Sequence, residues 1–132
     1  MIEKGKKIKV AVVGDGTMGH GISEVFAKAG HTVQIIGLND ASLKSALDRI
    51  KLSLNEFVAE GLVSASDIDT IVGRISFSTD IQKAEDAAIV IEALPENMDL
   101  KTETFGKLEK ICPQDTILAT ASGHSVSEVI AQ

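Results

Sequence analysis

Residues 8–22 read IKVAVVGDGTMGHGI, a β-branched run that ends in glycine and continues into helical spacing. Residues 8–13 are typical of a buried parallel strand, because apolar side chains follow one another there without alternation. Residues 18–29 carry apolar side chains three and four positions apart, which predicts an amphipathic helix. The stretch therefore predicts a strand, a tight turn and a helix in direct succession.

The glycines between that strand and that helix form the pattern G-x-G-x-x-G at Gly14, Gly16 and Gly19. In this context the first glycine permits the turn, the second lets the backbone approach a pyrophosphate, and the third lets the helix pack closely on the strand. The free N–H groups and the positive dipole end of the helix would then face the phosphates. The pattern favours a dinucleotide site, and the alternative is a structural turn that binds no ligand.

The rest of the chain continues to alternate between strands and helices. Further strands are expected at residues 32–36, 75–78, 87–91 and 116–120, and further helices at 40–58, 66–72 and 98–112, with another opening at a capping box of Ser125 and Glu128. This order predicts a single α/β domain with a Rossmann-type, doubly wound parallel sheet in three αβα layers and the strand order 3-2-1-4-5. The short last helix has little to pack against, so residues 1–132 are expected to be the dinucleotide-binding part of a longer protein.

Composition narrows the class of protein. The net charge is −6, which argues against a nucleic-acid surface, and the basic residues at positions 4–9 suit a solvated terminus. Cys112 is the only cysteine, so neither an intrachain disulfide nor a cysteine-based zinc site is expected. The chain has no run of apolar residues long enough for a membrane span and no signal-peptide core, so a cytoplasmic location is expected.

Two positions depart from the usual dinucleotide site. Asp15 places a carboxylate in the turn, where it would repel a pyrophosphate unless its side chain points away. The acid that normally ends the second strand and binds the adenosine ribose is replaced by Gly37, and Asn39, Asp40 and Ser42 are the nearby polar residues. The usual residue therefore does not decide between NAD and NADP, and the substitution Gly37→Asp is expected to tighten NAD binding.

Residues 9–22, 26–31 and 91–97 resemble the 3-hydroxyacyl-CoA dehydrogenase family, and the likeness extends over residues 8–131. The resemblance implies an amino-terminal NAD domain of an oxidoreductase that moves hydride between NAD and C3 of a 3-hydroxyacyl-CoA or 3-ketoacyl-CoA. It also implies an acyl-CoA substrate and a homodimer formed through a carboxy-terminal domain. One alternative is a diverged nucleotide-binding or regulatory module without dehydrogenase activity, and another is a structural domain that binds nothing.

The resemblance also assigns roles to individual residues. It places the pyrophosphate on Gly14, Gly16, Thr17, Met18 and Gly19, adds cofactor contacts from Glu96 and Lys101, and sets Ser53 at a position that touches CoA. The alternative for Glu96 and Lys101 is a solvated set of charges at a helix start. For Ser53 the alternative is an ordinary serine on a helix surface.

The catalytic positions of the family are not matched. After the fifth strand the family reads Asn-Thr-Ser-Ser, whereas residues 121–124 read ASGH. The family's catalytic His–Glu pair lies beyond Gln132, and His124 is expected to be a solvated loop residue. His20 and His31 are not expected to be catalytic either. No catalytic residue is assigned, and the chain alone is expected to be inactive.

Overall fold

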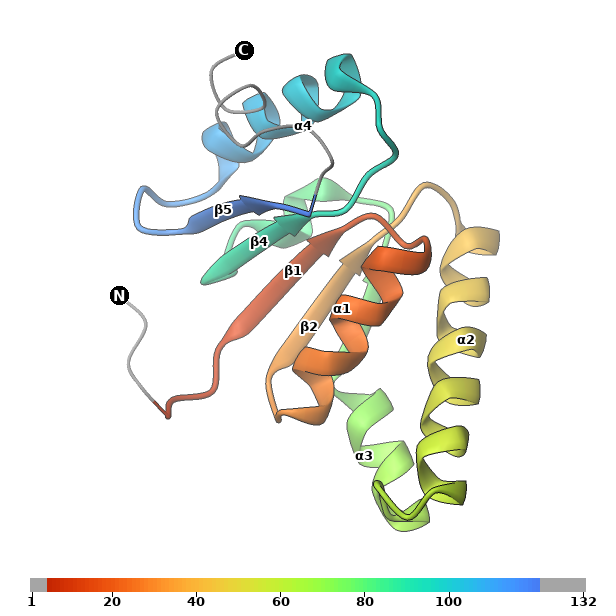
Figure 1. Ribbon diagram of the computed structural model, residues 1–132. Coiled ribbons are helices and arrows are strands. Elements are labelled where there is room, and N and C mark those ends of the chain that lie inside the picture. The colour runs from red at the N-terminus through yellow and green to blue at the C-terminus, as the bar shows by residue number, and fades with distance from the viewer. Residues whose placement is uncertain (1–4, 122–132) are drawn as a thin grey trace.

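Figure 1 shows the computed structural model, which describes residues 5–121. Five parallel strands form one sheet in the order β3-β2-β1-β4-β5. The strands are β1 (Lys9–Val13), β2 (Thr32–Ile36), β3 (Ile75–Ser78), β4 (Ile89–Glu92) and β5 (Ile117–Thr120). The helices are α1 (Thr17–Lys28), α2 (Asp40–Ala59), α3 (Ile68–Gly73) and α4 (Met98–Ile111), with the short 3-10 helices η1 (Ala65–Asp67) and η2 (Ile81–Ala84). The predicted fold class and strand order are confirmed.

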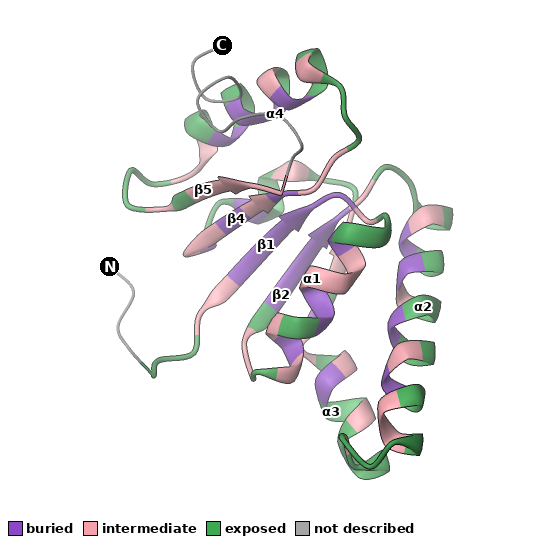
Figure 2. Ribbon diagram, viewed as in Figure 1, coloured by how far each residue is buried: buried purple, intermediate pink, exposed green. Residues whose placement is uncertain are grey.

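The central strand β1 is buried on both faces. Val10 and Val12 contribute to one apolar cluster, whereas Ala11 and Val13 contribute to a second cluster on the opposite face. Helices α1, α2 and α3 cover the first face, and α4 with η2 covers the second (Figure 1). Because neither face meets water, β1 is apolar without a break from Val10 to Val13, and Figure 2 shows it almost entirely buried.

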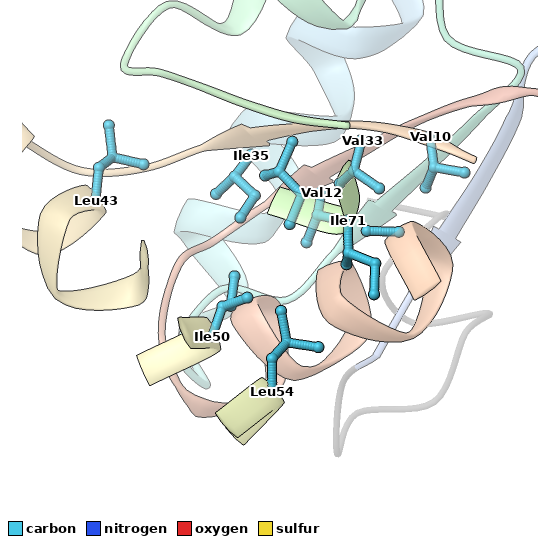
Figure 3. Close-up of a cluster of buried hydrophobic side chains, with 10 residues drawn as sticks. Val10, Val12, Val33, Ile35, Leu43, Ile50, Leu54 and Ile71 are labelled. Atoms are coloured by element: carbon cyan, nitrogen blue, oxygen red, sulfur yellow. The ribbon is translucent and has the colours of Figure 1, made fainter. Parts of the chain in front are cut away.

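The larger cluster fixes the helices that carry the first half of the sheet. Figure 3 shows side chains of β1 and β2 meeting those of α2 and α3, namely Val10, Val12, Val33, Ile35, Leu43, Ile50, Leu54 and Ile71. All eight are less than 8% exposed. This packing places the start of α2 beside the end of β2, next to the glycine turn.

The structure departs from the predictions at strand β4, which spans Ile89–Glu92 in place of residues 87–91, and it adds helix η2. Strand β4 runs to Glu92 and not to Ile91, because Glu92 pairs in register with Val13 and Thr120 and its carboxylate finds buried partners. Helix η2 was not predicted, since a segment of four residues has no detectable period. The capping box at Ser125 and Glu128 lies outside the described residues. Among residues 5–121, no helix is long and apolar enough to cross a membrane.

Candidate nucleotide-binding site

The glycine turn lies where the direction of the strand order reverses. From β1 the chain proceeds outward to β2 and β3, and then returns to the other side of β1 for β4 and β5. In open parallel α/β sheets, ligands bind at the carboxyl ends of the strands at this switch point. The turn after β1 and the loop from β4 to α4 are the two segments that border it (Figure 1).

Two of the three glycines in the turn are required by the fold itself. Gly14 has φ of +123°, and its N–H donates to the carbonyl of Ile36 at 2.8 Å. A Cβ on Gly14 would lie 2.5 Å from the carbonyl oxygen of Ala93, and one on Gly19 would lie 2.0 Å from that of Gly14. By contrast, a Cβ on Gly16 would meet no atom within 4 Å. The backbone at Gly16 therefore faces open space in which a ligand can approach.

The first turn of α1 presents unpaired donors to that space. Gly16 is the N-cap, no side chain caps the helix, and its first turn holds no acidic residue. The other long helices differ, because Asn39 caps α2 and Asn97 caps α4 through side-chain oxygens. An uncapped helix start carries free N–H groups and partial positive charge, which suit a phosphate oxygen. These residues fit the pyrophosphate of a dinucleotide.

Asp15 is directed toward α2. Its Oδ2 accepts a hydrogen bond from Ser42 Oγ, and a Cβ built on Gly37 would lie only 2.3 Å from the same oxygen. The carboxylate therefore lies over the end of β2, so the condition that it should point away from the pyrophosphate is met. The space beside Gly37 is filled by Asp15 and Leu43, so the substitution Gly37→Asp would have to displace these side chains, and its effect on NAD affinity stays a prediction. Gly37 does not have positive φ, so a side chain at this position would meet neighbouring atoms and would not strain the backbone.

A buried ion pair organises the loop on the other side of the switch point. Glu92 and Lys101 are both 0% exposed, and Lys101 Nζ lies 2.7 Å from Glu92 Oε2. The same oxygen accepts the N–H of Leu94 at 2.6 Å, and Oε1 accepts the hydroxyl of Thr120 at 2.6 Å. Lys101 also donates to the carbonyl of Leu94 at 3.1 Å. The network joins the ends of β4 and β5 to α4, and it satisfies the buried charges.

The two charged residues predicted from the resemblance lie in different environments. Glu96 is exposed in the loop between β4 and α4, whereas Lys101 is fully buried on α4. The alternative of solvated charges is therefore wrong for Lys101. Cofactor contact by either residue stays a prediction.

Ser53 faces α1 and not open solvent. Its Oγ donates to Glu24 Oε2 at 3.0 Å, and Glu24 is 7% exposed. Glu24 Oε1 has no hydrogen-bond partner within the described part of the chain. Ser53 is therefore more than an ordinary serine on a helix surface, because it binds a buried carboxylate between two helices. Its contact with CoA stays a prediction.

A pocket of about 430 Å³ lies at the far end of α1 from the glycine turn. It is lined by residues of α1, α2 and α3 that include Lys28, Phe57 and Ile71. The ammonium of Lys28 lies 3.8 Å from the centroid of the Phe57 ring. This pocket is separate from the switch point and takes no part in the candidate site.

The described histidines make local hydrogen bonds. His20 Nδ1 lies 2.7 Å from the carbonyl of Gly16, and His31 Nδ1 accepts the N–H of Ile8 at 3.2 Å. Neither ring forms an ion pair with a carboxylate in residues 5–121. Ala121 donates its N–H to the carbonyl of Glu92, and the predictions for residues 122–124 lie outside the described residues.

Two features of the site had no role in the sequence interpretation. Glu92 ends an apolar strand, and Lys101 falls on the apolar stripe of α4 with Phe105 and Leu108, so their pairing had a detectable signal. The bond between Asp15 and Ser42 had none, because it joins the glycine turn to the first turn of α2 through side-chain rotamers.

Comparison with known proteins identifies the family. The model of the 3-hydroxyacyl-CoA dehydrogenase NAD-binding domain matches residues 9–132. A probable 3-hydroxybutyryl-CoA dehydrogenase of Bacillus subtilis is 38% identical over 93% of this chain and 43% of its own length. The 3-hydroxyadipyl-CoA dehydrogenase of Escherichia coli is 37% identical over 93% of this chain and 26% of its own.

The solved structures agree with the sequence relatives. The 3-hydroxybutyryl-CoA dehydrogenase of Escherichia coli superposes with a TM-score of 0.90 at 35% identity, over 96% of this chain and 27% of that one. The (S)-3-hydroxybutyryl-CoA dehydrogenase of Ralstonia eutropha also superposes with a TM-score of 0.90, at 29% identity, over 96% of this chain and 45% of that one. The chain spans less than half the length of these relatives and matches their amino-terminal part. The chain belongs to the 3-hydroxyacyl-CoA dehydrogenase family and is its NAD-binding domain.

Proposed function

We propose that this domain holds NAD for hydride transfer at C3 of a 3-hydroxyacyl-CoA or 3-ketoacyl-CoA. The observation that carries the proposal is the uncapped start of α1 behind the open face of Gly16, at the switch point of the sheet. Bound NAD would supply the hydride acceptor, or as NADH the donor. The chain itself supplies the binding surface.

We propose that the turn residues Gly14, Gly16, Thr17, Met18 and Gly19 bind the pyrophosphate. Gly14 and Gly19 do so by fixing the path of the turn, and Gly16 does so by leaving room for the phosphates. Thr17 and Met18 begin α1 and offer its first N–H groups.

On the β4 side we propose Glu96 and Lys101 as the residues that serve the cofactor. Glu96 is exposed on the loop that borders the switch point. Lys101 donates to the carbonyl of Leu94 in that loop and to the buried carboxylate of Glu92. Its buried position gives Lys101 the additional role of a positioning residue for the segment that carries Glu96.

Complete catalysis is proposed to need groups beyond this domain. Proton transfer at the substrate oxygen requires a positioned base, and His20 and His31 are engaged in backbone hydrogen bonds. We propose that the domain acts as the amino-terminal part of a two-domain, cytoplasmic protein, whose other domain completes the acyl-CoA site and forms a homodimer. On its own the domain would then bind NAD without oxidising a 3-hydroxyacyl-CoA. A diverged binding module is the alternative, favoured by the departure from the family sequence at Ala121.

The proposal is tested by calorimetric titration of the 132-residue chain with NAD. The substitution Gly16→Val should abolish binding, because the added side chain enters the space that the pyrophosphate needs, while backbone φ of −75° tolerates a side chain. The loss of glycine at the N-cap should cost no more than about 1 kcal/mol of unfolding free energy.

Gly21→Val is the matched control for Gly16→Val. A Cβ at Gly21 also meets nothing within 4 Å, but it lies one turn further along α1. Gly21→Val should leave NAD affinity unchanged. Equal affinity of the wild type and Gly16→Val would show that the turn has only a structural role.

A further inference from the structure

The end of β2 carries no acidic side chain of its own. In dinucleotide-binding sheets this position usually supplies the carboxylate that accepts hydrogen bonds from the adenosine ribose. Here the strand is followed by Gly37, and the volume that a side chain would enter is taken by Asp15 Oδ2 and the Leu43 side chain. A carboxylate is therefore present at the expected place, although it comes from the glycine turn.

We propose that Asp15 binds the adenosine ribose hydroxyls and selects NAD over NADP. The inference rests on the proposed function, since it assumes that a dinucleotide occupies the turn. It deepens that function by naming a specificity-determining residue. A 2′-phosphate at the same place would meet a like charge, whereas two hydroxyls can donate to a carboxylate.

The carboxylate of Asp15 is anchored through one oxygen. Ser42 Oγ donates to Oδ2, and Ser42 is itself fixed by the capping box of α2, where its N–H donates to Asn39 Oδ1 at 2.8 Å. Within residues 5–121, Oδ1 of Asp15 accepts no hydrogen bond, and Asp15 forms no ion pair. The side chain is partly exposed. One oxygen is thus held in place while the other is available to a ribose hydroxyl.

The surroundings of Asp15 also suit an adenosine. Leu38 follows Gly37 and is 85% exposed, so the β2–α2 connection offers an exposed apolar side chain. An adenosine presents an apolar base face next to polar ribose hydroxyls. Gly37 completes the arrangement, because any larger residue there would displace the carboxylate of Asp15. Gly37 at the end of the strand and Asp15 in the turn are therefore complementary, because the glycine leaves the space that the carboxylate occupies.

Calorimetry with NAD, NADP and 2′-deoxyadenosine NAD tests the inference. Asp15→Asn keeps the shape and an acceptor for Ser42, and it should weaken NAD binding about tenfold, or about 1.4 kcal/mol. NADP binding should stay the same or tighten, and the wild-type preference for NAD over its 2′-deoxy analogue should shrink. Removing a negative charge from the protein should by itself favour the binding of an anionic ligand such as NAD. A loss of NAD affinity in Asp15→Asn would therefore not be an effect of net charge.

Asp48→Asn is the matched charge control. It makes the same change in net charge from an exposed position two turns further along α2, and it should not reduce NAD affinity. A second control returns the acid to the strand. Gly37→Asp alone should weaken NAD binding, because two carboxylates would compete for one space, whereas Asp15→Ala with Gly37→Asp should recover most of the affinity.

Three results would overturn the inference. Equal NAD affinity of Asp15→Asn and the wild type, with an unchanged ratio of NAD to NADP affinity, would leave Asp15 with only a structural bond to Ser42. A loss confined to Asp40→Asn would assign the ribose to the exposed acid in the first turn of α2. Failure of the folded wild type to bind NAD at all would reject the proposed function, and the inference with it. Thermal denaturation of each variant establishes that it is folded.

Discussion

The two segments that border the switch point are built in opposite ways. The β1–α1 turn consists of backbone, with glycine at three of six positions and a helix start that no side chain caps. The β4–α4 loop is held by buried charge, with Lys101, Glu92 and Thr120 joined by side-chain hydrogen bonds. The turn leaves its donors free for a ligand, whereas the loop satisfies its charges within the protein. A binding surface and a support thus meet at one edge of the sheet.

The largest effect on stability is expected on the supporting side. Lys101→Met would leave the carboxylate of Glu92 buried and without its cation, and it should lower the free energy of unfolding by about 3–5 kcal/mol. Urea denaturation measures this loss. The double variant Glu92→Gln with Lys101→Met should be more stable than Lys101→Met alone, because the uncompensated charge is gone. A loss below about 1 kcal/mol in the single variant would mean that the pair does not organise the loop.

A smaller effect on stability is expected in the turn. Gly19→Ala places a Cβ 2.0 Å from the carbonyl oxygen of Gly14, which is backbone and cannot rotate away. We expect a loss of about 1–3 kcal/mol, as for overpacking in a core. Gly21→Ala is the control, and it should gain up to about 1 kcal/mol because alanine favours the helix interior. Equal stability of the two variants would contradict the close approach of α1 to the turn.

The smallest effect is expected at an exposed ion pair away from both segments. The hydrogen bond from the Lys9 ammonium lowers the pKa of Asp86 below its usual value of 3.8. A lowered pKa contributes stability that is present above pH 3.8 and is lost as the pH falls through the folded-state value. The Asp86 side chain is 67% exposed, so the contribution should stay below about 1 kcal/mol.

Urea denaturation at a series of pH values checks this prediction. Asp86→Asn should leave stability at neutral pH nearly unchanged and should slightly reduce its fall below pH 3.8. If Asp86→Asn lost as much stability at neutral pH as Lys101→Met, the difference between buried and exposed ion pairs on which the comparison depends would be contradicted.

Most of the fold follows from the sequence. Strands β2 and β3 were predicted to the residue, because β2 is rich in β-branched residues and β3 alternates apolar and polar residues. The whole strand order was also predicted. Local patterns suffice here, since each depends on neighbouring residues in the chain.

The site was predicted less completely, because part of it depends on contacts between distant segments. The glycine pattern indicated the turn, and the structure distinguishes the two glycines required by packing from Gly16, which faces open space. The placement of the Asp15 carboxylate over Gly37 depends on a rotamer and on the cap of α2. The rotamer leaves no periodic trace in the sequence, so the sequence indicated only that the end of β2 lacks an acid, whereas the structure places the carboxylate of Asp15 there.

The central position of β1 has a consequence during synthesis. Val10 pairs with Val33 of β2 on one side and with Ile89 of β4 on the other. At a translation rate of about 5–20 residues per second, roughly 4–16 s separate the appearance of Val10 from that of Ile89. For that period one edge of the most apolar strand has no partner, and unpaired strand edges recruit other chains. The nascent domain is therefore most exposed to misassembly along the β1 edge, until β4 leaves the ribosome and closes the sheet.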